Sequence, residues 1–206
     1  HPIGLPGYFD EVIVLVTKPN LTFIGAGKDV TIVGPATSYI PFGRGPRAFF
    51  SLPPNTFALR SLTVENVYRL VFANNYVDIE DCSFAARDQQ IACVTVYDSG
   101  ARVESCDFTL HGGRGVTLNG PSSGATILDC RFMCVGSSSP INCSFGPRNV
   151  RVSNCTVTNG YFIFYDTTGE VENCTFTNEI VTALVVDEPT SNVHFREISV
   201  SGGAEI

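Results

Sequence analysis

Four charged residues at strand-like spacing form the first candidate for a chemical site. Asp78 and Glu80 stand two residues apart, and Arg102 and Glu104 repeat this spacing later in the chain. If both segments are neighbouring strands, alternation places all four side chains on one outward face. Three carboxylates beside an arginine would hold calcium or bind a uronate. The same pattern is typical of a solvated sheet whose opposite charges pair across strands, and we prefer that interpretation.

Asn-x-Ser/Thr sequons, which accept N-linked glycans in secreted proteins, form a second group of candidates. The four sequons begin at Asn20, Asn142, Asn154 and Asn173. We interpret all four as candidate glycosylation sites, which predicts a secreted protein or one displayed on a cell or virion surface. Because Asn154 and Asn173 occupy equivalent places in successive segments, their side chains could instead form a hydrogen-bonded ladder in a turn.

The remaining polar motifs favour structural roles. Asp98, Asp166 and Asp187 each follow a strand-like segment and are typical of turns. The loop from His111 to Arg114 contains two glycines and is a weak candidate for an anion-binding nest. The histidines and cysteines show no spacing typical of a metal site, so no metal and no cofactor are predicted, apart from calcium at the charged residues described above.

An internal repeat reveals the elements that must position these residues. In five segments a cysteine follows one apolar residue by three positions and precedes another by two. The equivalent positions along the chain are Leu62, Cys82, Cys106, Cys130, Cys155, Cys174 and Ile198. Short strands separated by Gly, Asn, Asp, Ser and Pro, repeating every ~22 residues without a helix, are typical of a parallel β-solenoid. The repeat therefore predicts an all-β solenoid of about eight coils.

The repeat cysteines are interpreted as a buried ladder of small, adaptable side chains. Cys134 and Cys143 lie off this ladder and are the one pair for which we predict a disulfide.

Composition excludes several classes of partner. The 206 residues carry a net charge of −7, and only 16% of them are charged. Binding to nucleic acid or to an anionic membrane would require a basic face. No apolar run approaches the roughly 18 residues of a membrane span, so insertion into a membrane is not expected. We expect one domain over residues 1–206, either complete or a segment of a longer chain.

Residues 57–200 resemble right-handed parallel β-helices of the pectin-lyase-like superfamily. The stretch Lys18-Pro-Asn-Leu-Thr-Phe-Ile-Gly-Ala-Gly-Lys-Asp-Val-Thr-Ile32 resembles the first coil of pectin methylesterases, and Gly160-Tyr-Phe-Ile-Phe164 resembles their segment Val-Asp-Phe-Ile-Phe-Gly. The resemblance implies a right-handed β-helix. Tyr161 stands where the esterases have their nucleophilic Asp, and Val135-Gly-Ser-Ser-Ser139 lacks their second Asp, the general acid. We therefore expect no esterase catalysis by that mechanism.

Two main functions remain open. Strand-like Val12–Val16 near the start and Gly202 soon after the last repeat predict open solenoid ends, covered by a second copy or by flanking parts of a longer chain. The first hypothesis is a non-catalytic extracellular module with a structural or surface role, a glycosylated subunit that stacks head to tail into a fibril. The alternative is a lyase-like or esterase-like β-helix that binds or processes an acidic or neutral polysaccharide. Its aromatic platforms would be Tyr68, Tyr97, Tyr161 and Tyr165. A plain scaffold for protein contacts is a third hypothesis.

Overall fold

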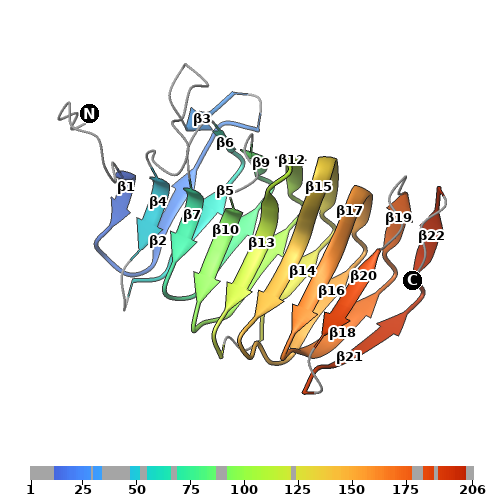
Figure 1. Ribbon diagram of the computed structural model, residues 1–206. Helices are drawn as coiled ribbons and strands as arrows, with labels where there is room; N and C mark the ends of the chain where they lie inside the picture. The colour runs from blue at the N-terminus through green and yellow to red at the C-terminus, as the bar shows by residue number, and fades with distance from the viewer. Residues whose placement is uncertain are drawn as a thin grey trace.

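The parallel β-solenoid predicted from the repeat is confirmed. The computed structural model describes residues 12–28, 30–33, 47–51, 55–65, 69–86, 92–121, 124–177, 183–187 and 190–202. All the secondary-structure elements of these residues are β-strands, and every strand pair is parallel. The strands of successive coils lie side by side in chain order, from the N-terminal to the C-terminal coil (Figure 1).

One side of the solenoid, sheet B, takes one strand from each successive coil. Its eight strands follow chain order. They are β2 (Leu21–Ile24), β5 (Phe57–Arg60), β8 (Val77–Glu80), β11 (Ala101–Glu104), β14 (Thr126–Leu128), β16 (Val150–Ser153), β18 (Thr168–Glu172) and β21 (Asn192–Arg196). Side chains alternate between the interior and the outer face, as period-two patterning requires. Leu59, Ile79 and Val103 are fully buried and lie in register in one column of the core.

The other strands form sheet A, which consists of two layers. Layer A1 follows sheet B along each coil and contains β3 (Ile32–Val33), β6 (Thr63–Glu65), β9 (Ser83–Ala86), β12 (Asp107–His111), β19 (Thr175–Thr177) and β22 (Ser199–Ser201). Layer A2 contains β1 (Val12–Val16), β4 (Arg47–Ser51), β7 (Arg69–Ala73), β10 (Ala92–Tyr97), β13 (Arg114–Asn119) and β20 (Leu184–Asp187). The long strands β15 (Arg131–Ser144) and β17 (Thr156–Tyr165) pass through both layers and join them into one sheet.

The bend from sheet B into layer A1 uses a residue with a left-handed backbone in coil after coil. This residue directly precedes each position of the cysteine repeat, and its φ lies between +50° and +56°. The seven residues are Ser61, Asp81, Ser105, Asp129, Asn154, Asn173 and Glu197. Short polar side chains that hydrogen-bond locally tolerate this conformation better than bulky ones do, which explains the Asp, Asn and Ser at six of these positions. The repeated bend gives each coil the same direction of turn.

The repeat cysteines form the expected buried ladder. Cys82, Cys106, Cys130, Cys155 and Cys174 are each at most 1% exposed, and all are free thiols; we call them the cysteine ladder. Beside the ladder, the rings of Phe84, Phe108 and Phe132 stack with centroids 5.1 and 4.7 Å apart. Columns of like side chains therefore build one core along the whole solenoid.

The predicted disulfide between Cys134 and Cys143 is wrong, because both residues are free, buried thiols. Cys134 pairs in register with Leu110 in layer A1, whereas Cys143 pairs with Leu118 in layer A2. Each cysteine therefore fills a column of the core that belongs to a different layer.

Candidate functional site

The four charged residues chosen from the sequence do meet on the outer face of sheet B. Asp78 pairs in register with Arg102, and Glu80 pairs with Glu104. The Arg102 guanidinium lies 3.1 Å from an oxygen of Asp78 and 3.6 Å from Glu80, and it also forms an ion pair with Glu104. Arg60 from the preceding coil approaches Asp78 to 2.5 Å and Glu80 to 3.1 Å. We call these five residues the charged face.

The charged face is occupied by its own ion pairs. Hydrogen bonding to Asp78 raises the pKa of Arg102, so that side chain remains a cation between the carboxylates. Within the described ranges, no group of three or more His, Cys, Asp or Glu side chains is arranged to hold a metal ion. The arrangement favours the interpretation of paired charges on a solvated sheet, in which each exposed pair contributes only ~0–1 kcal/mol.

A second set of ion pairs continues along sheet B. Arg151 lies 2.6 Å from Glu172. Arg196 lies 3.2 Å from Glu170 and 3.1 Å from Glu172. The hydrogen bond from Arg151 holds the pKa of Glu172 below its ordinary value. These residues share the two outward columns of the charged face, so sheet B carries a second set of compensated ion pairs in its C-terminal coils.

Lys28, which the sequence did not single out, connects the first coil to later ones. Its ammonium nitrogen lies 3.1 Å from Asp107 and 3.2 Å from Asp81, and it donates a 2.9 Å hydrogen bond to the carbonyl of Ser105. Burial alone would lower the pKa of Lys28, but the hydrogen bonds to Asp107 and Asp81 raise it. Lys28 also borders an open groove of about 560 Å³ over layer A1, whose walls include Thr63, Glu65, Ser83, Thr109 and His111.

An aromatic pocket lies where layer A2 turns back into sheet B. The pocket has a volume of about 490 Å³. The residues that line it are Ser144, Phe145, Tyr165, Asp166 and Thr190. The side chain of Phe145 is conspicuously outside the core, since the residue is 79% exposed. Its φ of +65° is uncommon for a bulky residue, so the backbone holds this ring outward at a cost in strain.

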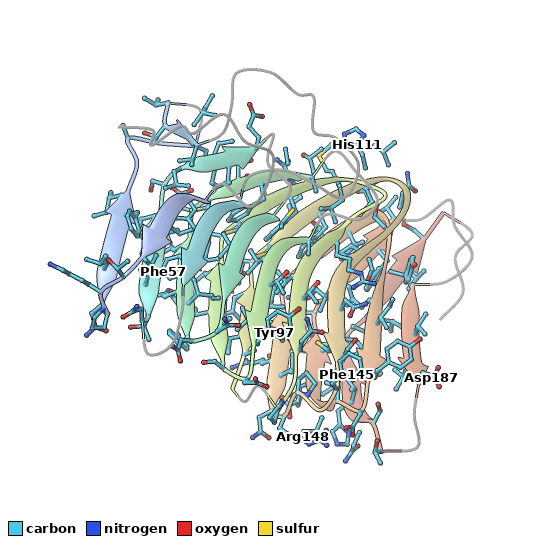
Figure 2. The ribbon with its side chains drawn as sticks, turned by 60° about the vertical axis from the view of Figure 1, so that its left-hand side comes forward. Phe57, Tyr97, His111, Phe145, Arg148 and Asp187 are labelled. Carbon is cyan, nitrogen blue, oxygen red and sulfur yellow. The ribbon has the colours of Figure 1, made fainter. Side chains whose placement is uncertain are left out.

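The polar wall of the aromatic pocket is held in place by Asp166, whose charged carboxylate pairs with Arg148. Hydrogen bonds from Thr190 and Arg148 hold the pKa of Asp166 below its ordinary value. The distance from the Arg148 guanidinium to the Asp166 carboxylate is 3.0 Å. Figure 2 shows Phe145 and Arg148 near one edge of the solenoid, with His111 at the opposite edge. Gly146 and Pro147 mark a turn in the sequence, but sequence reasoning missed Phe145, because a bulky aromatic residue is not expected to adopt a left-handed backbone.

The turn aspartates and the glycine loop have local partners or solvent positions. Asp98 has a φ of +53° and is exposed, as expected for a turn residue, and Asp187 is exposed at the end of β20. In the loop from His111 to Arg114, the backbone N–H of Gly112 donates to the hydroxyl of Ser138 at 3.0 Å. That donor is therefore already used within the fold, which weakens the case for an anion nest.

The predicted aromatic platforms are only partly available. Tyr97, Tyr161 and Tyr165 are half-buried, and Tyr68 lies outside the described residues. Tyr161, which stands at the position of the esterase nucleophile, lies on β17. In the stretch that lacks the second esterase carboxylate, Ser138 and Ser139 are buried.

The four sequons differ sharply in exposure. Asn20, Asn154 and Asn173 are exposed at turns, whereas Asn142 is only 5% exposed on β15. The amide nitrogen of Asn173 donates to the amide oxygen of Asn154 at 2.8 Å, so the hydrogen-bonded turn ladder expected from the sequence is present. Asn20 accepts a 2.8 Å hydrogen bond from the hydroxyl of Thr56.

Comparison with known families agrees with this geometry. A family model described as "right handed beta helix region" matches residues 63–181 of the chain. No curated protein matches the sequence. Among the described residues, none belongs to a helix long and apolar enough to cross a membrane.

Proposed function

Because the chain belongs to the right-handed β-helix family, we propose that it is a non-catalytic structural module. The charged face supports this proposal, since Arg60 and Arg102 engage its three carboxylates in ion pairs. A carboxylate that acts as a general base or nucleophile would instead need to face a substrate. Tyr161 at the position of the esterase nucleophile supports the same conclusion.

Association between copies of the chain is suggested by the outermost strands of each sheet, because they carry like side chains in the same columns of the core. Sheet B runs from β2 to β21, the outermost strands of that sheet in the described part of the chain. Phe23 and Phe195 occupy the same column of the core and are half-buried. Beside Phe195, a hollow of about 410 Å³ is lined by Leu184, Val186, Glu197 and Ile198. Parallel strands with an unpaired edge can accept a further strand.

We infer that the C-terminal coil accepts the N-terminal coil of a second copy. Continuing the observed register would place Phe23 of that copy over Phe195, and Val33 over Val200. Like side chains would then continue two columns that already run through the molecule. Such a contact joins two different surfaces and does not close on itself, so repeated contacts produce a filament.

Association is tested by sedimentation velocity and electron microscopy over a range of protein concentrations. The wild-type chain is expected to form linear oligomers, and Phe195→Arg to remain monomeric, because it places a charge in the contact. Met133→Arg is the matched control, since Met133 is an exposed apolar residue on the lateral face of layer A1. Thermal unfolding must confirm that both variants fold. A wild-type chain that stays monomeric at high concentration would contradict the proposal.

We further propose that the module works outside the cell and is glycosylated. The support is the exposure of Asn20, Asn154 and Asn173, since a glycan acceptor must lie at the surface. Because the amide nitrogen of Asn173 is held by Asn154, we expect either of these two asparagines to carry a glycan less often than Asn20 does.

A second candidate function, binding of a neutral saccharide, is favoured by the aromatic pocket. Phe145 and Tyr165 offer ring faces to the apolar side of a sugar, and Asp166 with Arg148 offers acceptors and donors for its hydroxyl groups. The Arg148–Asp166 pair is neutral as a unit, so an uncharged sugar suits it better than a uronate.

Saccharide binding is tested by calorimetry with neutral and acidic oligosaccharides. Phe145→Ala is expected to weaken binding at least tenfold, while Met133→Ala, at another exposed apolar position, leaves it unchanged. Absence of heat with every neutral oligosaccharide, or equal loss in both variants, would exclude this second function.

A further inference from the structure

The cysteine ladder presents five thiols in one uniform conformation. Each sulfur donates a hydrogen bond to the carbonyl oxygen two residues earlier, and the five S···O distances lie between 3.1 and 3.3 Å. Identical bonds in successive coils mean that all five side chains point the same way from the same backbone position. The sulfurs therefore form a straight column along the solenoid axis.

Neighbouring sulfurs of the column are close enough to interact with one another. Backbone hydrogen bonds hold successive coils in register at these positions, because the carbonyl oxygens of Cys82, Cys106, Cys130 and Cys155 each accept a backbone N–H from the following coil at 2.9–3.0 Å. In-register parallel strands impose a spacing of roughly 4.8 Å between equivalent side chains. A core column of Val or Ile would fill the same space, but it would contain no sulfur atoms with lone pairs to share.

We propose that the cysteine ladder binds soft, two-coordinate d¹⁰ cations between successive sulfurs, cuprous ion being the physiological member of this class. A metal–thiolate bond is about 2.3 Å long, so a linear sulfur–metal–sulfur unit spans ~4.6 Å, close to the spacing of the strands. Thiolate is the ligand that selects soft cations of this kind. Such a site uses two ligands from adjacent coils, unlike the groups of three or four that hold zinc.

Charge balance determines the protonation of each pair. One thiol transfers its proton to solvent and binds as a thiolate, while its neighbour binds through a sulfur lone pair and keeps its proton. A monovalent cation then gives a neutral unit, which avoids burying a net charge in the apolar column. One proton is released for each cation bound, and no electron transfer is required.

The C-terminal end of the ladder provides the entry route. Cys174 is its last member, and the next position of the column is the half-buried Ile198. Ile198 lines the hollow of about 410 Å³ at the C-terminal coil, so a displacement of this coil brings solvent to the sulfur of Cys174. Cys174 is therefore the thiol of the ladder that an entering ion meets first.

The test uses silver ion as an air-stable probe, with native mass spectrometry of the folded, reduced chain. Five thiols offer alternate gaps for two ions, so we expect two silver ions per chain, a raised Tm and one proton released per ion. Cys155→Ala leaves Cys82, Cys106 and Cys130 as one run and is expected to bind one ion. Cys130→Ala leaves two separate pairs and is expected to keep two.

Cys143→Ala is the control for unspecific thiol binding, because Cys143 is equally buried but lies in layer A2. It should retain two silver ions. Near-ultraviolet circular dichroism confirms that each variant stays folded during the titration. The proposal is overturned if the folded wild type binds no silver, if binding requires unfolding, or if Cys130→Ala and Cys155→Ala lose the same number of ions.

Discussion

Two asparagines that each begin a sequon lie in opposite environments. Asn20 is exposed at a turn, whereas Asn142 is 5% exposed and its amide oxygen accepts a 2.8 Å hydrogen bond from Ser144. Asn142 lies in a column with Thr95 and Thr117, which are also buried. A sequon describes only local sequence, so it does not distinguish a turn from the interior of a sheet.

This difference makes a prediction for the chain secreted from eukaryotic cells. Asn20→Gln is expected to remove a glycan and increase the electrophoretic mobility, because Asn20 remains accessible in the folded chain. Asn142→Gln is expected to leave the mobility unchanged. Glycosidase treatment should bring all forms to the same mobility, and peptide mass spectrometry locates the glycan. Detection of a glycan on Asn142 of the folded protein would contradict the burial seen in β15.

At the scale of the strands, the charged face is a set of carboxylates whose arginine partners take the place that a metal cation would otherwise occupy. Arg102 on β11 forms ion pairs with Asp78 and Glu80 of β8 and with Glu104 of its own strand. In the wild type, calcium would have to displace this internal cation, so we expect calcium to leave the Tm unchanged. In Arg102→Ala, the three carboxylates lose their common partner and repel one another.

Calcium is therefore expected to raise the Tm of Arg102→Ala by a few degrees, although that variant starts from a lower Tm in the absence of calcium. Differential scanning calorimetry with and without millimolar calcium measures the effect. Arg131→Ala is the control, since Arg131 pairs with Asp107 at 3.0 Å in layer A1, away from the charged face. An equal response of both variants would mean that calcium acts elsewhere.

The regular strands could be predicted because the cysteine repeat carries the register. The spacing from Cys82 to Cys106 places Asp78 opposite Arg102, as observed. The irregular contacts could not be predicted in the same way. Lys28 reaches Asp107 across 79 residues of sequence, and no periodic pattern encodes that contact. Phe145 adopts a left-handed turn that its side chain disfavours, so local preference pointed away from the observed structure.

For the molecule as a whole, acid sensitivity follows from carboxylates that bridge different coils. Asp81, Asp166 and Glu172 each have a pKa below the ordinary value, because hydrogen bonds from Ser61 and Lys28, from Thr190 and Arg148, and from Arg151 favour the charged forms. A lowered folded-state pKa stabilises the protein above the unfolded-state pKa, and this stability is lost as the pH falls through the folded-state pKa.

The Tm is therefore expected to stay nearly constant from pH 7 to about 5 and to decrease below about pH 5, because the unfolded carboxyls, with pKa values of about 4, then bind protons more readily than the folded ones. The decrease should be gradual, since these groups are largely exposed and solvent screens their interactions. Asp166→Asn should lower the Tm at pH 7 and reduce its dependence on pH. A Tm that rises on acidification would contradict these pKa directions.

The parallel stacking of coils also determines how the molecule responds to mechanical force. Each strand is hydrogen-bonded only to the coil before it and the coil after it, and the core columns run through these same contacts. Tension applied between the two ends along the axis would load the outermost strand first and detach it as a unit. The next coil would then become the outermost one and meet the same load. Extension should therefore proceed as a series of small, similar steps, in which the solenoid loses one coil after another from its end instead of unfolding in a single event.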